Sequence, residues 1–124
     1  MAEYDIKYYN NLSNEDKAVY NLSTFRQMLN NKDYSAIYNV LDSTFKNNNF
    51  SNVNNLQDYL KNHIYDLNYI NIMDKNKEEN GYYVFNCELQ NIRNNSETRN
   101  MVIVINLTEG TNFTMSFSFN ESSE

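Results

Sequence analysis

The stretch YYVFNCELQ, residues 82–90, decides the fold class of this chain. Apolar side chains recur there at every second position, at Tyr83, Phe85, Cys87 and Leu89. Successive side chains of a β-strand point to opposite faces, so this spacing places all four on one face. The positions between them are mixed, because Tyr82 and Val84 are followed by polar residues. The pattern predicts a strand with one buried face and one largely polar face.

Three more stretches of the chain have the character of strands. Residues 113–119 alternate in the same way, residues 101–105 are apolar at every position, and residues 69–73 form a shorter apolar run. Glu79-Asn80-Gly81 and Glu109-Gly110-Thr111-Asn112 are typical turn sequences, and the polar residues 91–100 supply the remaining connection. Strands that follow one another through such turns predict a four-stranded antiparallel meander.

Residues ahead of Asp66 follow a helical period instead. Ser13 lies three residues before Asp16, which resembles a capping box and predicts the start of a first helix that ends at Asn30-Asn31. Asp33 is the expected N-cap of a second helix over residues 34–43. Ser51 or Asn52 is the expected N-cap of a third helix, which ends between residues 63 and 66. Helices followed by a meander predict an α+β fold, in which the N-terminal helices pack on one curved antiparallel sheet.

Length and charge limit the classes of partner. The chain has 124 residues, a formal net charge of −6 and dispersed basic residues. We expect one domain at residues 15–119, between a polar N-terminal segment or linker at residues 1–14 and a frayed acidic tail at residues 120–124. Phosphate backbones bind clustered positive charge, so nucleic acid and anionic membranes are not expected partners. Direct membrane insertion is not expected either, because no run of about 20 apolar residues is present.

The residues that carry chemistry are few. The inward strand positions offer one phenol, Tyr83, and one thiol, Cys87, but no carboxylate or imidazole. His63 and Asp66 form the best acid–base pair, although a spacing of three residues is also common at an exposed helix end. One His and one Cys cannot supply a zinc site, and the carboxylates of Asp74, Glu78 and Glu79 lack the spacing of an EF-hand. The sequence therefore predicts no catalytic residue, cofactor or metal, with His63 and Tyr83 as the polar groups at the mouth of any pocket.

One family resembles this order of elements. The segment FRQMLNNKDYSAIYNVLD, residues 25–42, resembles the opening of nuclear-transport-factor-2-like domains, where an Asp-Tyr or Asp-Phe pair begins the second helix. Residues 50–60 resemble the third helix of that family, and residues 67–119 resemble its strands. The resemblance implies a cone formed by helices on a curved sheet, as in ketosteroid-isomerase-type proteins. It does not imply one function, because the superfamily includes enzymes, ligand binders and assembly modules.

The sequence favours a non-catalytic binding or protein-interaction domain of a bacterial, envelope-associated protein. The 26 Asn residues and the excess of Lys over Arg are typical of an A/T-rich genome. Two alternatives stay open, namely an assembly domain resembling the periplasmic domains of type IV secretion and conjugation proteins, and a small-molecule isomerase or dehydratase. A signal or anchor ahead of this sequence would place the domain outside the cytoplasm, and without one we expect a cytoplasmic protein.

The expected partners are another protein, a second copy of the chain or a small apolar ligand. A homodimer is expected because the second face of the sheet carries apolar side chains that solvent disfavours. The residues of this predicted dimer face are Tyr82, Val84, Val102 and Val104.

Overall fold

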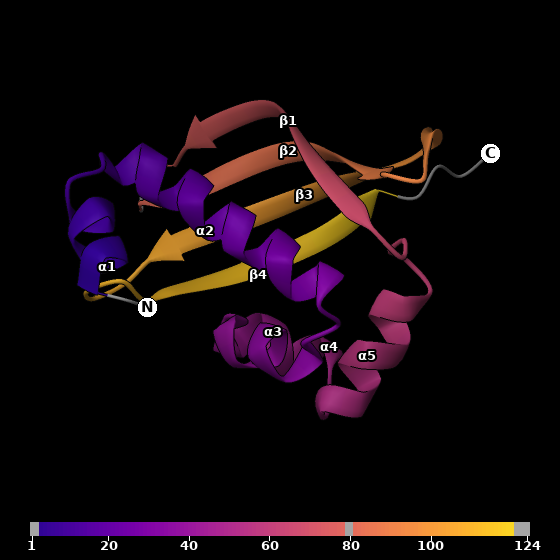
Figure 1. The fold of residues 1–124 in the computed structure, drawn as a ribbon. Helices are drawn as coiled ribbons and strands as arrows, with labels where there is room; N and C mark the ends of the chain where they lie inside the picture. Colours follow the sequence, from indigo (N-terminus) through magenta and orange to yellow (C-terminus); the bar gives the residue numbers. More distant parts are fainter. Residues whose placement is uncertain (1–2, 79–80, 121–124) are drawn as a thin grey trace.

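The structure, a computed structural model, describes residues 3–78 and 81–120. Helices come first in these residues and strands follow (Figure 1). The elements are α1 (Glu3–Asn10), α2 (Asn14–Asn30), α3 (Tyr34–Val40), α4 (Ser43–Asn49), α5 (Val53–Lys61), β1 (Asn68–Lys77), β2 (Tyr82–Asn91), β3 (Asn94–Leu107) and β4 (Phe113–Asn120). The predicted α+β class is confirmed.

The four strands form one antiparallel sheet in the order β1-β2-β3-β4. Each strand pairs with its neighbour in the chain, so the predicted meander is confirmed, and the sheet stays open because β1 and β4 are not paired with each other. Phe85 lies opposite Ile103, which in turn lies opposite Phe117. These three side chains are buried, and the alternating positions beside them on each strand are buried as well.

The buried face of the sheet, called the inner face, packs against the helices. Figure 1 shows α2 crossing this face diagonally, while α3, α4 and α5 lie together near β4. Phe25, which is fully buried in α2, stacks on Phe117 of β4 with ring centroids 6.1 Å apart. Fully burying a side chain of this kind stabilises the fold by about 1.5–3 kcal/mol. The core therefore lies between the inner face and the helical layer.

Three of the predicted helix starts are confirmed by their caps. The Ser13 hydroxyl accepts a hydrogen bond from the Asp16 N–H, Asp33 accepts from the Ala36 N–H, and Asn52 accepts from the Asn55 N–H. Each of these side chains satisfies a backbone donor that the first helical turn leaves unpaired. The expected starts of α2, α3 and α5 follow from these contacts, whereas the predicted end of the third helix between residues 63 and 66 is wrong, because α5 ends at Lys61.

Two helices were not predicted. Residues 3–10, expected to belong to a polar segment or linker, form α1, which docks through the buried Tyr9. The Tyr9 hydroxyl accepts a hydrogen bond from the buried Asn21 side chain of α2 at 3.1 Å. The second helix of the prediction is divided, since α3 ends at Val40 and Asp42 caps a separate helix, α4. α1 is docked by a tertiary contact that a local period does not contain, whereas α4 begins at the local cap of Asp42.

The strand boundaries also need correction. β3 begins at Asn94, inside the segment predicted to be a connection, because the ladder to β2 continues through polar residues. Backbone hydrogen bonds join the strands there whatever the side chains are, and the exposed residues show no apolar alternation. β4 includes Asn120, which the prediction placed in the frayed tail. The predicted turn residues 79–80 and the rest of the predicted tail, residues 121–124, lie outside the described residues.

Candidate functional site

The second face of the sheet, called the outer face, is the candidate functional surface. None of the described helices covers it, and its side chains are half-buried or exposed, in contrast to the inner face. Val84 lies opposite Val104, and Val104 lies opposite Ser116, so the two valines adjoin across the sheet. All four residues of the predicted dimer face, Tyr82, Val84, Val102 and Val104, are half-buried residues of this outer face.

Charge is scarce on this surface. Across β2, β3 and β4, the outer-face positions carry Ser, Thr, Asn, Gln and the residues of the predicted dimer face. Glu88 is the one charged side chain among them, and it accepts a hydrogen bond from Gln90 at 2.8 Å. The chain as a whole carries a net charge of −6. Across β2, β3 and β4 the outer face is therefore nearly neutral on an acidic protein, and β1 adds one carboxylate, Asp74, opposite Asn86.

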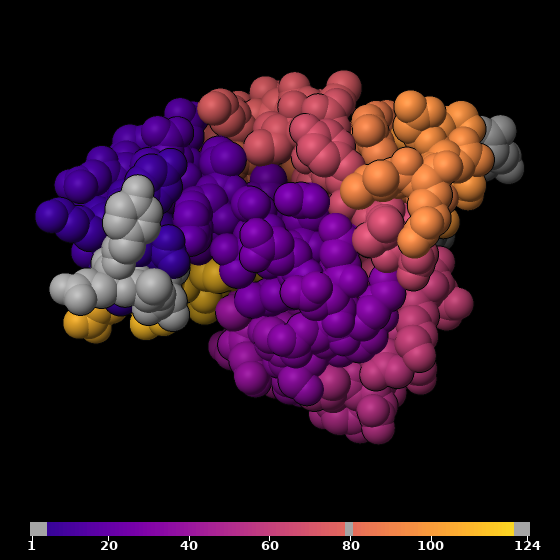
Figure 2. Space-filling view, viewed as in Figure 1, coloured from indigo at the N-terminus to yellow at the C-terminus, as the bar shows by residue number. Residues whose placement is uncertain are grey.

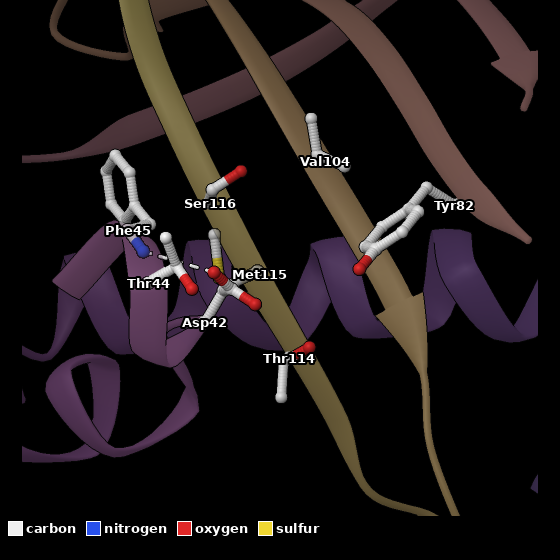
Figure 3. A pocket seen from close by; sticks show the side chains of 8 residues that line it. All are labelled: Asp42, Thr44, Phe45, Tyr82, Val104, Thr114, Met115 and Ser116. Atoms are coloured by element: carbon white, nitrogen blue, oxygen red, sulfur yellow. Dashed lines mark hydrogen bonds between the residues drawn. The ribbon is translucent and has the colours of Figure 1, made fainter. Parts of the chain in front are cut away.

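A pocket of about 320 Å³ opens at the end of this surface, where the chain before α4 passes the edge of β4 (Figure 3). Leu41 forms an isolated parallel β-bridge with Met115 there, and the Asp42 N–H donates a hydrogen bond to the Met115 carbonyl at 2.7 Å. Tyr82 and Val104 of the predicted dimer face form one wall of the pocket. The lining residues are Asp42, Thr44, Phe45, Tyr82, Val104, Thr114, Met115 and Ser116.

The pocket offers hydroxyl groups and a partly apolar wall rather than acid–base chemistry. Its one carboxylate belongs to Asp42, whose Oδ2 accepts a hydrogen bond from the Phe45 N–H at 3.1 Å and so caps α4. Its described lining includes no His, Cys or Lys. Such a lining suits a small ligand with hydroxyl groups and an apolar side.

The predicted pocket-mouth residues do not meet. Tyr83 is buried on the inner face in register with Ile105, whereas the His63 ring stacks on Tyr59 with centroids 4.1 Å apart and lies 5.0 Å from the Phe119 ring. His63 Nδ1 lies 2.7 Å from the Tyr59 carbonyl oxygen. These contacts place His63 in an aromatic cluster at the end of α5, far along the sheet from Tyr83.

The other chemical candidates are structural in the described residues. Asp66, the expected partner of His63, forms ion pairs with Arg93 at 3.2 Å and Lys32 at 3.9 Å. Cys87 is buried in the core, and this burial raises the pKa of its thiol to about 12. No group of three or more His, Cys, Asp or Glu residues able to hold a metal ion occurs among the described residues.

Neither protein-family models, nor curated proteins, nor solved structures gave a match to this chain. Among the described helices, none combines the length and the apolar character that crossing a membrane requires. The function of this chain is therefore inferred from its surface and pockets.

The sequence located Tyr82 and Val104 but missed the pocket that they help to form. Asp42, Thr44 and Ser116 were not singled out, because Asp42 lies between two helices, Thr44 lies in the first turn of the unpredicted α4, and Ser116 comes from a strand. The signal that was available is the Asp-Ser-Thr sequence at residues 42–44, a common N-cap pattern that marks the start of α4.

Proposed function

We propose that this chain is a non-catalytic protein-interaction domain that pairs with a second copy through its outer sheet face. The observation that carries the proposal is an uncovered, nearly neutral sheet face with adjoining valines on a protein of net charge −6. Two copies of an acidic protein repel each other, so close contact between them is favoured where negative charge is absent. An apolar patch rimmed by polar residues is also typical of interaction surfaces.

The architecture supports this reading without restricting it to one family. Helices packed on one face of an open antiparallel sheet agree with the resemblance to nuclear-transport-factor-2-like domains, and the cone of that fold is part of our proposal. The assembly function of type IV secretion and conjugation domains is a special case of the same proposal, since such domains associate with themselves. An envelope location belongs to this special case.

The pocket supports a second candidate function, the binding of a small ligand. Thr44, Thr114 and Ser116 bring hydroxyl groups to the same pocket that Val104 lines, which gives polar groups beside an apolar wall (Figure 3). Isomerase or dehydratase chemistry is less well supported, because the one carboxylate of the pocket is used to cap α4. Tyr82 and Val104 belong to both surfaces, so a ligand in the pocket would compete with the second copy.

The dimer is tested by substituting Val104 with Lys. Light scattering should give twice the chain mass of 14.7 kDa for the wild type at about 100 μM, well above micromolar dissociation constants, and one chain mass for Val104→Lys. The added charge brings the net charge closer to zero, so general repulsion cannot explain dissociation. Asn54→Lys, which makes the same change of charge at an exposed residue of α5, is the matched control and should stay dimeric. A wild type with the mass of one chain would refute the proposal.

A further inference from the structure

The edges of the sheet differ in how they are protected. The edge at β4 is covered, because Leu41 forms an isolated β-bridge with Met115. The ring centroids of Phe45 and Phe50 also lie 5.2 and 6.2 Å from that of Phe117. At β1, residues 69–77 make no described backbone hydrogen bond beyond those to β2. Unpaired edges are ready templates for another strand, and proteins usually block them with charges or bulges.

The second half of β1 is blocked in this way and the first half is not. The register shifts between Ile72 and Asp74, and the strand then carries Asp74, Lys75 and Lys77. Residues 69–72 carry no charge and pair with β2 in regular register, and the uncharged Met73 is the extra residue at the shift. Tyr69 is 48% exposed and Met73 is 63% exposed, so two of the large apolar side chains most open to solvent lie on this segment.

The side chain of Asn30 already forms hydrogen bonds with the backbone at the start of this edge, as a neighbouring strand would. The Asn30 carboxamide of α2 donates to the Asn68 carbonyl at 3.0 Å and accepts from the Asn68 N–H at 2.8 Å. Asn68 therefore points its backbone groups away from β2. Backbone direction alternates along an antiparallel strand, so Ile70 and Ile72 present their N–H and C=O groups to the same free edge.

A groove adjoins these free groups. Two contacts hold α2 beside β1, one at each end. They are the hydrogen bonds between Asn30 and Asn68 and an ion pair between Glu15 and Lys75 at 3.7 Å. Figure 2 shows β1 at the rim of the molecule next to α2. Between these two contacts lies a pocket of about 250 Å³, which can receive an apolar side chain. Its lining residues are Val19, Leu22, Ser23, Arg26, Tyr69, Ile70 and Ile72.

We propose that residues 69–73 of β1 bind an extended segment of a partner protein by strand addition. Backbone groups of the segment pair with Ile70 and Ile72, one apolar side chain enters the groove against α2, and a side chain on the opposite face covers Tyr69. Arg26 lines the groove and forms no ion pair among the described residues, so a carboxylate of the segment is its complement. The partner segment is therefore extended and apolar at alternate positions, with one acidic residue.

This surface is separate from the outer-face dimer, so the inference goes beyond the proposed function and can fail independently of it. The probe is a library of random seven-residue peptides displayed on phage, selected on the wild-type protein. Enriched peptides are then labelled with fluorescein and titrated by anisotropy. We expect alternating apolar residues with an Asp or Glu, and hydrogen exchange should show new protection at the amides of Ile70 and Ile72.

Variants test the geometry. Ile72→Pro removes an N–H that points away from β2, and it should weaken peptide binding at least tenfold, whereas Ile72→Val should bind within about twofold of wild type. Ser23→Trp fills the groove from an exposed position of α2, so it should also abolish binding, and it carries the test if Ile72→Pro fails to fold. Arg26→Glu should reverse the preference from Asp-bearing to Lys-bearing peptides.

Three results would overturn the proposal. The first is a selection without enriched peptides, and the second is unchanged binding by a folded Ile72→Pro or Ser23→Trp variant. The third is protection of Ile70 and Ile72 that rises with protein concentration in the absence of peptide, since a second copy would then occupy the edge. Val104→Lys should bind peptide as the wild type does, and Ile72→Pro should keep the mass of the dimer, which separates failure here from failure of the proposed function.

Discussion

Replacing Asn30 with Ala should destabilise this protein more than any change at an exposed asparagine. Asn68 is fully buried, and the Asn30 carboxamide pairs with both its N–H and its C=O. The Asn30 Oδ1 also accepts from the Asn68 side chain at 3.0 Å. Asn30→Ala leaves two backbone groups without this partner in a position closed to solvent.

The expected cost follows from these two groups. Each buried polar group left unpaired costs about 1–3 kcal/mol, so the free energy of unfolding should fall by roughly 2–6 kcal/mol. Water entering the space left by the side chain would move the result toward the lower value. The loss is a large part of the 5–15 kcal/mol that is typical of a whole domain.

Urea unfolding followed by far-ultraviolet circular dichroism measures this change directly. Asn54→Ala is the matched control, because Asn54 is exposed in α5 and its side chain makes no described hydrogen bond, so it should change the stability by less than about 0.5 kcal/mol. Asn30→Asp adds a finer test, because it keeps an acceptor for the Asn68 N–H but places an oxygen against the Asn68 carbonyl.

The acid dependence of Asn30→Asp has a defined sign. Burial and the facing carbonyl favour the protonated carboxyl in the folded state, so its folded pKa lies above the unfolded value. The variant should therefore recover stability relative to wild type as the pH falls toward about 4, the usual carboxyl pKa. An Asn30→Ala variant as stable as Asn54→Ala would refute the reasoning, since it would show that the Asn30–Asn68 contact contributes nothing.

Two further predictions concern Cys87 and His63. Burial raises the Cys87 pKa from 9.0 to about 12, so the unfolded chain loses this proton first as the pH rises. Above pH 9 the free energy of unfolding of the wild type should therefore fall by up to about 1.4 kcal/mol per pH unit more than that of Cys87→Ala. Parallel pH profiles of the two proteins in urea unfolding would contradict this. His63→Ala removes a ring stacked on Tyr59 at 4.1 Å and should cost about 1 kcal/mol, whereas His63→Phe, which keeps a ring, should recover most of it in the same assay. Equal stability of His63→Ala and wild type would show that the stack is unimportant.

The sequence by itself determined the features that depend on local spacing. Alternation at residues 82–90 identified β2 and its buried side chains, and the change from helical to alternating period near Asp66 divided the helices from the strands. Ser13 and Asp33 marked helix starts because their side chains bond to N–H groups only three residues away. Such signals need no knowledge of the distant parts of the chain.

Part of the candidate surface was also readable from the sequence. Tyr82, Val84, Val102 and Val104 could be placed on one face because strand residues alternate, and a meander brings neighbouring strands together. The extent of the face, its lack of charge and the pocket at its end required the register between strands. The alternation fixes which face each residue takes, but a shift of two residues would keep the faces and still change which side chains adjoin across the strands.

Only the tertiary structure decided the contacts between distant residues. α1 is polar over most of its length, and it is docked because Tyr9 is buried and bonds to Asn21, 12 residues further along the chain. Asn30 and Asn68 are 38 residues apart, and nothing near either one predicts that a side chain of α2 pairs with the edge of β1. Hydrogen bonds of this kind depend on where packing brings two groups, whereas the sequence period reports only which face of an element is buried.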